Sequence, residues 1–181
     1  MKKTILSFFT SSFFVFHLSA QEVGYNTTDI GAEFNNYAGG NIFNLHVAFN
    51  SKLHHSFIIR AGYQSVNEKY NSTLLNENGG GLMCGLGYRY YFTYKPTRLF
   101  MGVKFDYWKL DIDWNNTGTN GNINGSSIVP AIEAGYMFNF NDRFFLTPAI
   151  TAGTIANSTN ASAQMKNGFL FTAGLSAGVK F

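Results

Sequence analysis

The sequence predicts an all-β fold, an eight-stranded antiparallel up-and-down barrel, and three observations support this prediction. Apolar and polar residues alternate along segment after segment, which is the two-residue period of a strand. Clusters of Asn, Gly and Ser, typical of turns, separate the segments. Aromatic residues make up 17% of the chain and charged residues 13%, and Cys84 is its one cysteine, expected to be a small apolar side chain of the outer face. This composition suits strands whose bulky face does not meet water.

The first 20 residues are predicted to form a secretory signal peptide, which leaves a barrel domain of residues 21–181. Lys2 and Lys3 precede a mostly apolar stretch that ends in small residues before Gln21, the layout of such a signal. The two lysines also account for two of the three net positive charges, so a nucleic-acid partner is not expected.

Eight alternating segments follow Gln21, and each has one apolar face. The residues of that face are, segment by segment: Ile30, Ala32, Phe34; Phe43, Leu45, Val47, Phe49; Phe57, Ile59, Ala61, Tyr63; Leu82, Cys84, Leu86, Tyr88, Tyr90, Phe92; Leu99, Met101, Val103, Phe105, Tyr107; Ile128, Pro130, Ile132, Ala134, Tyr136, Phe138, Phe140; Phe144, Leu146, Pro148, Ile150, Ala152; and Phe169, Phe171, Ala173, Leu175, Ala177, Val179, Phe181.

The opposite faces carry glycine, hydroxyl and charged residues, which a soluble sandwich would not enclose while leaving Phe and Leu to water. We therefore expect the polar face inside and the apolar face against lipid. An open sheet edge in hydrocarbon leaves backbone groups unpaired, so the sheet must close into a barrel. Aromatic residues gather at both ends of the apolar segments, as in the aromatic girdles of membrane barrels.

The connecting segments alternate in length, apart from the first. They are residues 36–40, 50–55, 67–80, 93–98, 114–127, 141–142 and 157–166. Short periplasmic turns and longer outer loops are typical of membrane barrels, so the third, fifth and seventh connectors are predicted to be surface loops.

The inward charges are evenly matched, and we expect them to form a lumenal network of ion pairs because an unpaired buried charge is costly. Its predicted members are Asp29, Glu33, Asp106 and Glu133 with Arg60, Arg89, Lys104 and Lys180. An eight-stranded barrel has an interior just wide enough for side chains, so a packed lumen is expected.

The last strand, "FLFTAGLSAGVKF", alternates apolar residues and ends on an aromatic residue. With this ending the chain resembles the small eight-stranded outer-membrane barrels of Gram-negative bacteria, such as the transmembrane domain of outer membrane protein A and its porin-like and adhesin-like relatives. The resemblance implies that the barrel assembly machinery recognises Leu175, Ala177, Val179 and Phe181. It also implies location in the outer membrane, in contact with outer-membrane lipid and lipopolysaccharide.

One segment leaves alternatives open. In "KLDIDW", residues 109–114, the apolar side changes parity, so this strand either has a bulge or continues beyond the membrane as a protruding ribbon. Asp111 and Asp113 could contact a divalent cation or lipopolysaccharide, although a solvated face is favoured.

The function predicted first is a structural and surface-binding role through the outer loops, without enzymatic activity, metal or cofactor. A narrow channel is an alternative, because the inward residues Ile42, Ile58, Met83, Phe100, Val129, Met137 and Phe145 make the lumen partly apolar. A lipid A-modifying enzyme is another, but it needs a histidine beside a nucleophile or carboxylate at the outer leaflet. His54 and His55 fall in a predicted periplasmic turn, and His46 is predicted to face the lumen.

Overall fold

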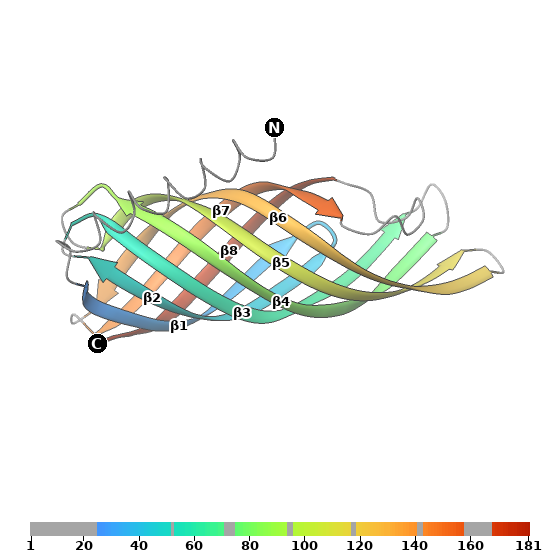
Figure 1. Ribbon diagram of the computed structural model, residues 1–181, viewed down its shortest axis with the longest axis horizontal. Helices are drawn as coiled ribbons and strands as arrows, with labels where there is room; N and C mark the ends of the chain where they lie inside the picture. Colours follow the sequence, from blue (N-terminus) through green and yellow to red (C-terminus); the bar gives the residue numbers. More distant parts are fainter. Residues whose placement is uncertain are drawn as a thin grey trace, which may run out of the picture.

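The structure is a closed barrel of eight antiparallel strands in chain order (Figure 1). The computed structural model describes residues 25–51, 53–70, 75–93, 96–116, 119–140, 143–157 and 168–181. The strands are β1 Tyr25–Tyr37, β2 Gly40–Ser51, β3 His55–Tyr70, β4 Leu75–Tyr91, β5 Arg98–Asn116, β6 Thr119–Phe140, β7 Phe144–Asn157 and β8 Gly168–Lys180. The predicted signal peptide lies outside these residues. The fold class predicted from the sequence is confirmed.

The seam between β1 and β8 closes the barrel. The two strands pair from Asp29 with Lys180 to Tyr37 with Thr172. Below this ladder, the backbone N–H of Thr28 donates to the carbonyl oxygen of Phe181 at 3.0 Å, and the N–H of Phe181 donates back at 2.9 Å. The two ends of the described chain therefore meet at one end of the barrel.

That end also holds the connections between β2 and β3, β4 and β5, and β6 and β7, and we call it the turn end (Figure 1). At the opposite end, which we call the hairpin end, the β3–β4 and β5–β6 hairpins extend well beyond the β1–β2 hairpin (Figure 1). The strand ladders show why: β3 and β4 pair as far as Tyr70 with Leu75, and β5 and β6 as far as Asn116 with Thr119.

These ladders correct the predicted third and fifth loops. Residues 67–80 and 114–127 are largely strand, and they form the outer parts of two long hairpins. Asn- and Gly-rich segments show no apolar alternation, so the sequence pattern alone does not reveal these strands. Residues 158–166 of the predicted seventh loop lie outside the described part of the chain.

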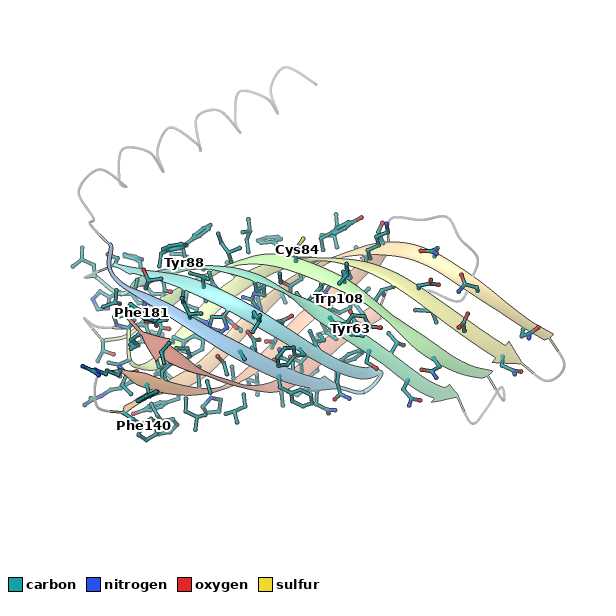
Figure 2. The ribbon with its side chains drawn as sticks, turned by 90° about the horizontal axis from the view of Figure 1, so that it is seen from below. Tyr63, Cys84, Tyr88, Trp108, Phe140 and Phe181 are labelled. Carbon is teal, nitrogen blue, oxygen red and sulfur yellow. The ribbon has the colours of Figure 1, made fainter. Side chains whose placement is uncertain are left out.

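Side chains alternate across the barrel wall as predicted. Large apolar residues cover the outside, where Leu82 is 70% exposed and Phe105 59% exposed, and the charged residues Arg60 and Glu133 are buried inside. Figure 2 shows Tyr88, Phe140 and Phe181 toward the turn end, with Tyr63 and Cys84 nearer the hairpin end. Within the described residues, no helix is long and apolar enough to cross a bilayer.

Candidate functional site

The lumen contains a continuous network of ion pairs at mid-height, and its centre is Glu133. Arg89 donates to Glu133 from Nε to Oε1 at 2.7 Å and from Nη2 to Oε2 at 3.3 Å. Lys104 Nζ lies 3.4 Å from Glu133 Oε2 and 3.5 Å from Glu33 Oε1. Lys104 on β5 therefore bridges carboxylates that come from β6 and β1.

Arg60 extends the network toward the hairpin end. Its Nη1 lies 3.9 Å from Glu33 Oε1, and its Nε lies 3.8 Å from Asp106 Oδ1. Asn35 donates a hydrogen bond of 2.7 Å to Glu33 from the same strand. The structure thus brings six of the eight predicted residues into one chain of contacts, with partners from five strands.

The other two predicted residues form a separate pair at the turn end. Lys180 Nζ lies 4.0 Å from Asp29 Oδ2 across the β1–β8 seam. The same ammonium donates to the carbonyl oxygen of Pro96 at 3.0 Å and to Asn139 Oδ1 at 3.3 Å. Lys180 therefore reaches from β8 to the β4–β5 connection and to β6, across the mouth of the barrel.

Two clusters of buried apolar side chains lie in the lumen, one on each side of the ion pairs. The cluster toward the turn end consists of Tyr91, Phe100, Met137 and Phe145. The guanidinium of Arg89 lies 4.5 Å from the ring centroid of Phe100, so a cation–π contact joins this cluster to the ion pairs. The larger cluster, toward the hairpin end, consists of Ile42, Val66, Met83, Trp108, Leu110, Ile112, Val129 and Leu170, and we call it the apolar lid.

The inward apolar residues predicted from the sequence are all buried, and most belong to these two clusters. Sequence reasoning missed Trp108, Leu110 and Ile112 as lumenal residues. The signal was present: they continue the two-residue period that begins at Lys104 and Asp106 on the inward face of β5.

Between the ion pairs and the lid lies a cavity of about 10 Å³. Polar residues such as Asn44, Asp106 and Thr151 line it on one side, and Trp108 and Val129 line it on the other. A cavity of this size holds about one water molecule.

Of the described histidines, His46 and His55 lie on opposite faces of the barrel wall. His46 is buried in the lumen, with its ring centroid 6.0 Å from that of Phe145. His55 is exposed on the outer wall, whereas the next residue, Ser56, is buried inside. Because successive strand residues point to opposite faces, the wall of the barrel separates this histidine from this hydroxyl.

The segment "KLDIDW" contains no bulge. Strand β5 pairs residue by residue with β4 and β6 through this region, so the protruding ribbon is the alternative that the structure shows. Asp111 and Asp113 lie on its outer face, and Asn122 donates to both carboxylates, at 2.6 Å and 2.9 Å. In the described part of the chain, no group of three or more His, Cys, Asp or Glu side chains could hold a metal ion.

The residues of the predicted assembly signal lie on β8 and at the end of the chain. Leu175, Ala177 and Phe181 are exposed on the outside of the barrel, and Val179 is partly buried. Ala177 pairs with Ala32, and Val179 pairs with Ile30, along the seam with β1.

Comparison with solved structures shows that the fold is shared with small outer-membrane barrels. The N-terminal β-barrel domain of Pseudomonas aeruginosa OprF matches with a TM-score of 0.56 and 18% identity, covering 87% of this chain and 99% of that chain. The attachment invasion locus protein Ail of Yersinia pestis matches with a TM-score of 0.51 and 12% identity, covering 86% of this chain and 95% of that chain. A major outer membrane protein of Thermus thermophilus has a TM-score of 0.50 and 10% identity, with 86% and 99% coverage.

These identities establish the architecture alone. No curated protein matches the chain. One family does, over residues 7–170, and its description is "Protein of unknown function (DUF3575)". Since this match covers most of the sequence, the chain belongs to the DUF3575 family.

Proposed function

We propose that this chain is an integral protein of the bacterial outer membrane, closed to solutes, which binds a partner at the cell surface through its two long hairpins. The observation that carries the proposal is a change in polarity along β5. Strand register is continuous through the change, so the same wall of the barrel meets two different solvents.

In the barrel body, β5 is apolar outside and charged inside. Phe105 and Tyr107 are exposed on the outer face, and Lys104 and Asp106 are buried in the lumen. Exposed aromatic residues over buried charges suit a wall in contact with hydrocarbon.

Beyond Tyr107 the same strand is polar outside and apolar inside. Trp108, Leu110 and Ile112 are buried, with 1%, 5% and 5% exposure, whereas Lys109 and Asp111 face outward. This is the arrangement of a water-soluble sheet. The outer boundary of the membrane therefore lies close to residue 108, and the rest of the β5–β6 hairpin extends into water.

The packed lumen argues against the channel alternative. The cavity between the apolar lid and the ion pairs has a volume of about 10 Å³. A solute that crossed the barrel would therefore have to displace the lid and separate Lys104 and Arg89 from Glu133. The surface of the protruding hairpins is then the region that we propose for binding a partner in water. The separation of His55 from Ser56 likewise supports binding over catalysis.

Hairpin truncation tests the proposal without disturbing the barrel. Residues 68–77 and 113–122 would each be replaced by Asn-Gly, which favours a two-residue hairpin turn. The flanking pairs, Asn67 with Asn78 and Ile112 with Ile123, are kept. The truncated protein should keep the gel mobility shift between cold and boiled detergent samples and lose surface binding, measured with whole cells expressing each form.

Two results would contradict the proposal. Undiminished binding by the truncated protein would show that the hairpins are not the binding surface. Solute uptake by proteoliposomes containing the intact protein would show that the barrel is open. The intact mass of the membrane-extracted protein tests the remaining element, export with removal of residues 1–20.

A further inference from the structure

At the turn end, two histidines and three aromatic residues gather on the outer wall beside the start of β3, and we call this group the rim cluster. Its members are His54, His55, Tyr88, Tyr90 and Phe92. The ring of His54 stacks on Tyr90 with centroids 5.2 Å apart, and Phe92 meets the same tyrosine edge-on at 5.7 Å. Imidazole groups are unusual members of a lipid-facing aromatic belt, which is ordinarily built from Trp and Tyr.

The backbone around His54 is fixed. His54 has a φ of 25°, an uncommon value for a residue with a side chain. Two contacts hold it against β4: the N–H of Tyr91 donates to the carbonyl oxygen of His54 at 2.7 Å, and His54 Nδ1 lies 2.7 Å from the carbonyl oxygen of Tyr91. A strained conformation kept in place by specific bonds is a reason to look for a function.

His55 and Tyr88 form the polar part of the rim cluster. The Nδ1 of His55 lies 2.6 Å from the hydroxyl oxygen of Tyr88, and both side chains are exposed. A neutral imidazole and a phenol together carry two acidic protons, and one of them occupies this bond. If Nδ1 of His55 carries the proton, it donates to Tyr88 and the Tyr88 O–H is free to donate to a ligand. If Nε2 carries the proton, Tyr88 donates to Nδ1 and the Nε2–H is free. The pair therefore always offers a hydrogen-bond donor to an acceptor outside the barrel.

The surroundings indicate what that acceptor is. Leu53, Phe57 and Phe92 are exposed near this rim, at 46%, 43% and 53%, so a ligand there meets hydrogen-bond donors beside apolar surface. A phosphate group is a strong acceptor, and a lipid attaches it to acyl chains that can lie along the apolar wall. We propose that the rim cluster binds the phosphate group of a glycerophospholipid in the membrane leaflet at the turn end.

This inference rests on the proposed membrane location. The Tyr88–His55 pair donates its one free proton to the phosphate, and Tyr90 and Phe92 contact the glycerol and the first methylenes of the acyl chains. The β6 strand offers a matched control. Tyr136 is exposed on the same outer wall with the ring of Phe138 at 4.6 Å, and no histidine ring among the described residues contacts it.

The test is native mass spectrometry of the folded, detergent-extracted protein with added phosphatidylglycerol. A double substitution, His55→Phe with Tyr88→Phe, keeps the aromatic surface and removes both donors. We expect about a tenfold loss of affinity for the first bound lipid, as for one hydrogen bond to a charged group. Tyr136→Phe should leave the affinity unchanged. A diacylglycerol with the same acyl chains should bind as weakly to the intact protein as phosphatidylglycerol does to the double variant.

Equal retention of phosphatidylglycerol by the intact protein and the double variant would overturn the inference. Binding of the diacylglycerol to the intact protein as tightly as phosphatidylglycerol would also overturn it, because the affinity would then come from the acyl chains alone. Glycerol phosphate without acyl chains separates the two possible sources of phosphate: tight binding of this compound would show a site for a soluble phosphate and contradict the lipid assignment. The gel mobility shift is scored on the same samples. If the shift is absent the membrane proposal itself fails, whereas a normal shift with unchanged lipid retention rejects this inference alone.

Discussion

Replacing Glu133 with alanine should destabilise the barrel more than any other single change to a carboxylate of the ion-pair network. Glu133 is buried, accepts both hydrogen bonds from Arg89 and lies 3.4 Å from Lys104. Its removal leaves Arg89 buried without its bidentate partner and takes the Glu133 contact from Lys104, which keeps Glu33. Breaking a buried pair from one side typically costs about 3–5 kcal/mol, and we expect a loss of unfolding free energy in that range.

The assay is equilibrium unfolding by urea in lipid vesicles, followed by tryptophan fluorescence. Ile132→Ala is the matched control, because the neighbouring side chain faces outward and its truncation leaves no charge unpaired. A double variant, Arg89→Met with Glu133→Leu, removes the pair as a whole and should recover to within about 2 kcal/mol of the native protein. A loss below about 1 kcal/mol for Glu133→Ala, or a double variant less stable than either single variant, would refute the reasoning.

Three further predictions follow from the packing and the seam. Trp108→Ala removes the largest side chain of the apolar lid and should lower the free energy of unfolding by about 3–5 kcal/mol. Trp108→Phe should lower it by less in the same unfolding assay. Equal stability of the native protein and both variants would show that the lid is not packed. Gly81→Ala places a Cβ against the carbonyl oxygen of Lys109, so the β4–β5 ladder must shift, at about 1–3 kcal/mol, and refolding yield in vesicles should fall below that of the native protein. A normal yield and stability would contradict the close approach. Phe181→Ser should reduce assembly into the outer membrane of cells, measured by membrane fractionation. It should not reduce refolding in vesicles, because the hydrogen bonds between residue 181 and Thr28 are made by backbone atoms. Normal assembly in cells would show that Phe181 is not part of the proposed assembly signal.

The sequence could predict which side chains face the lumen and which face outward, because charged and apolar side chains alternate with the two-residue period of a strand. Along β5, Lys104 and Asp106 alternate with Val103, Phe105 and Tyr107, and a charged lumenal face cannot be confused with a lipid-facing one. The same alternation correctly predicts eight strands and closure into a barrel.

The extent of the hairpins and the apolar lid could not be predicted in the same way. The segment 119–126 is rich in Asn and Gly, and it forms a strand because it pairs with β5, not because of its own propensity. At Trp108 the apolar residues change from the outer to the inner face, which is a signal that a bulge would also produce.

The partners within the ion-pair network depend on the shape of the closed barrel. Glu33, Lys104 and Glu133 come from β1, β5 and β6, and they meet only because the strands curve around one lumen. The sequence identifies these residues as inward and charged. The alternation pattern does not reveal the tilt and stagger of the strands, and these determine which carboxylate each cation contacts.

The measurement that tests the account most directly asks which solvent touches each part of β5. Single cysteines would be introduced at Val103 and Asp113, both on the outer face, after replacement of Cys84 by alanine, and each would be labelled with a fluorophore in lipid vesicles. We predict that nitroxide-labelled lipids quench the label at 103 and that aqueous iodide quenches the label at 113. Iodide quenching at 103 would show that the apolar outer wall meets water, and the inverted barrel proposed for this chain would be wrong.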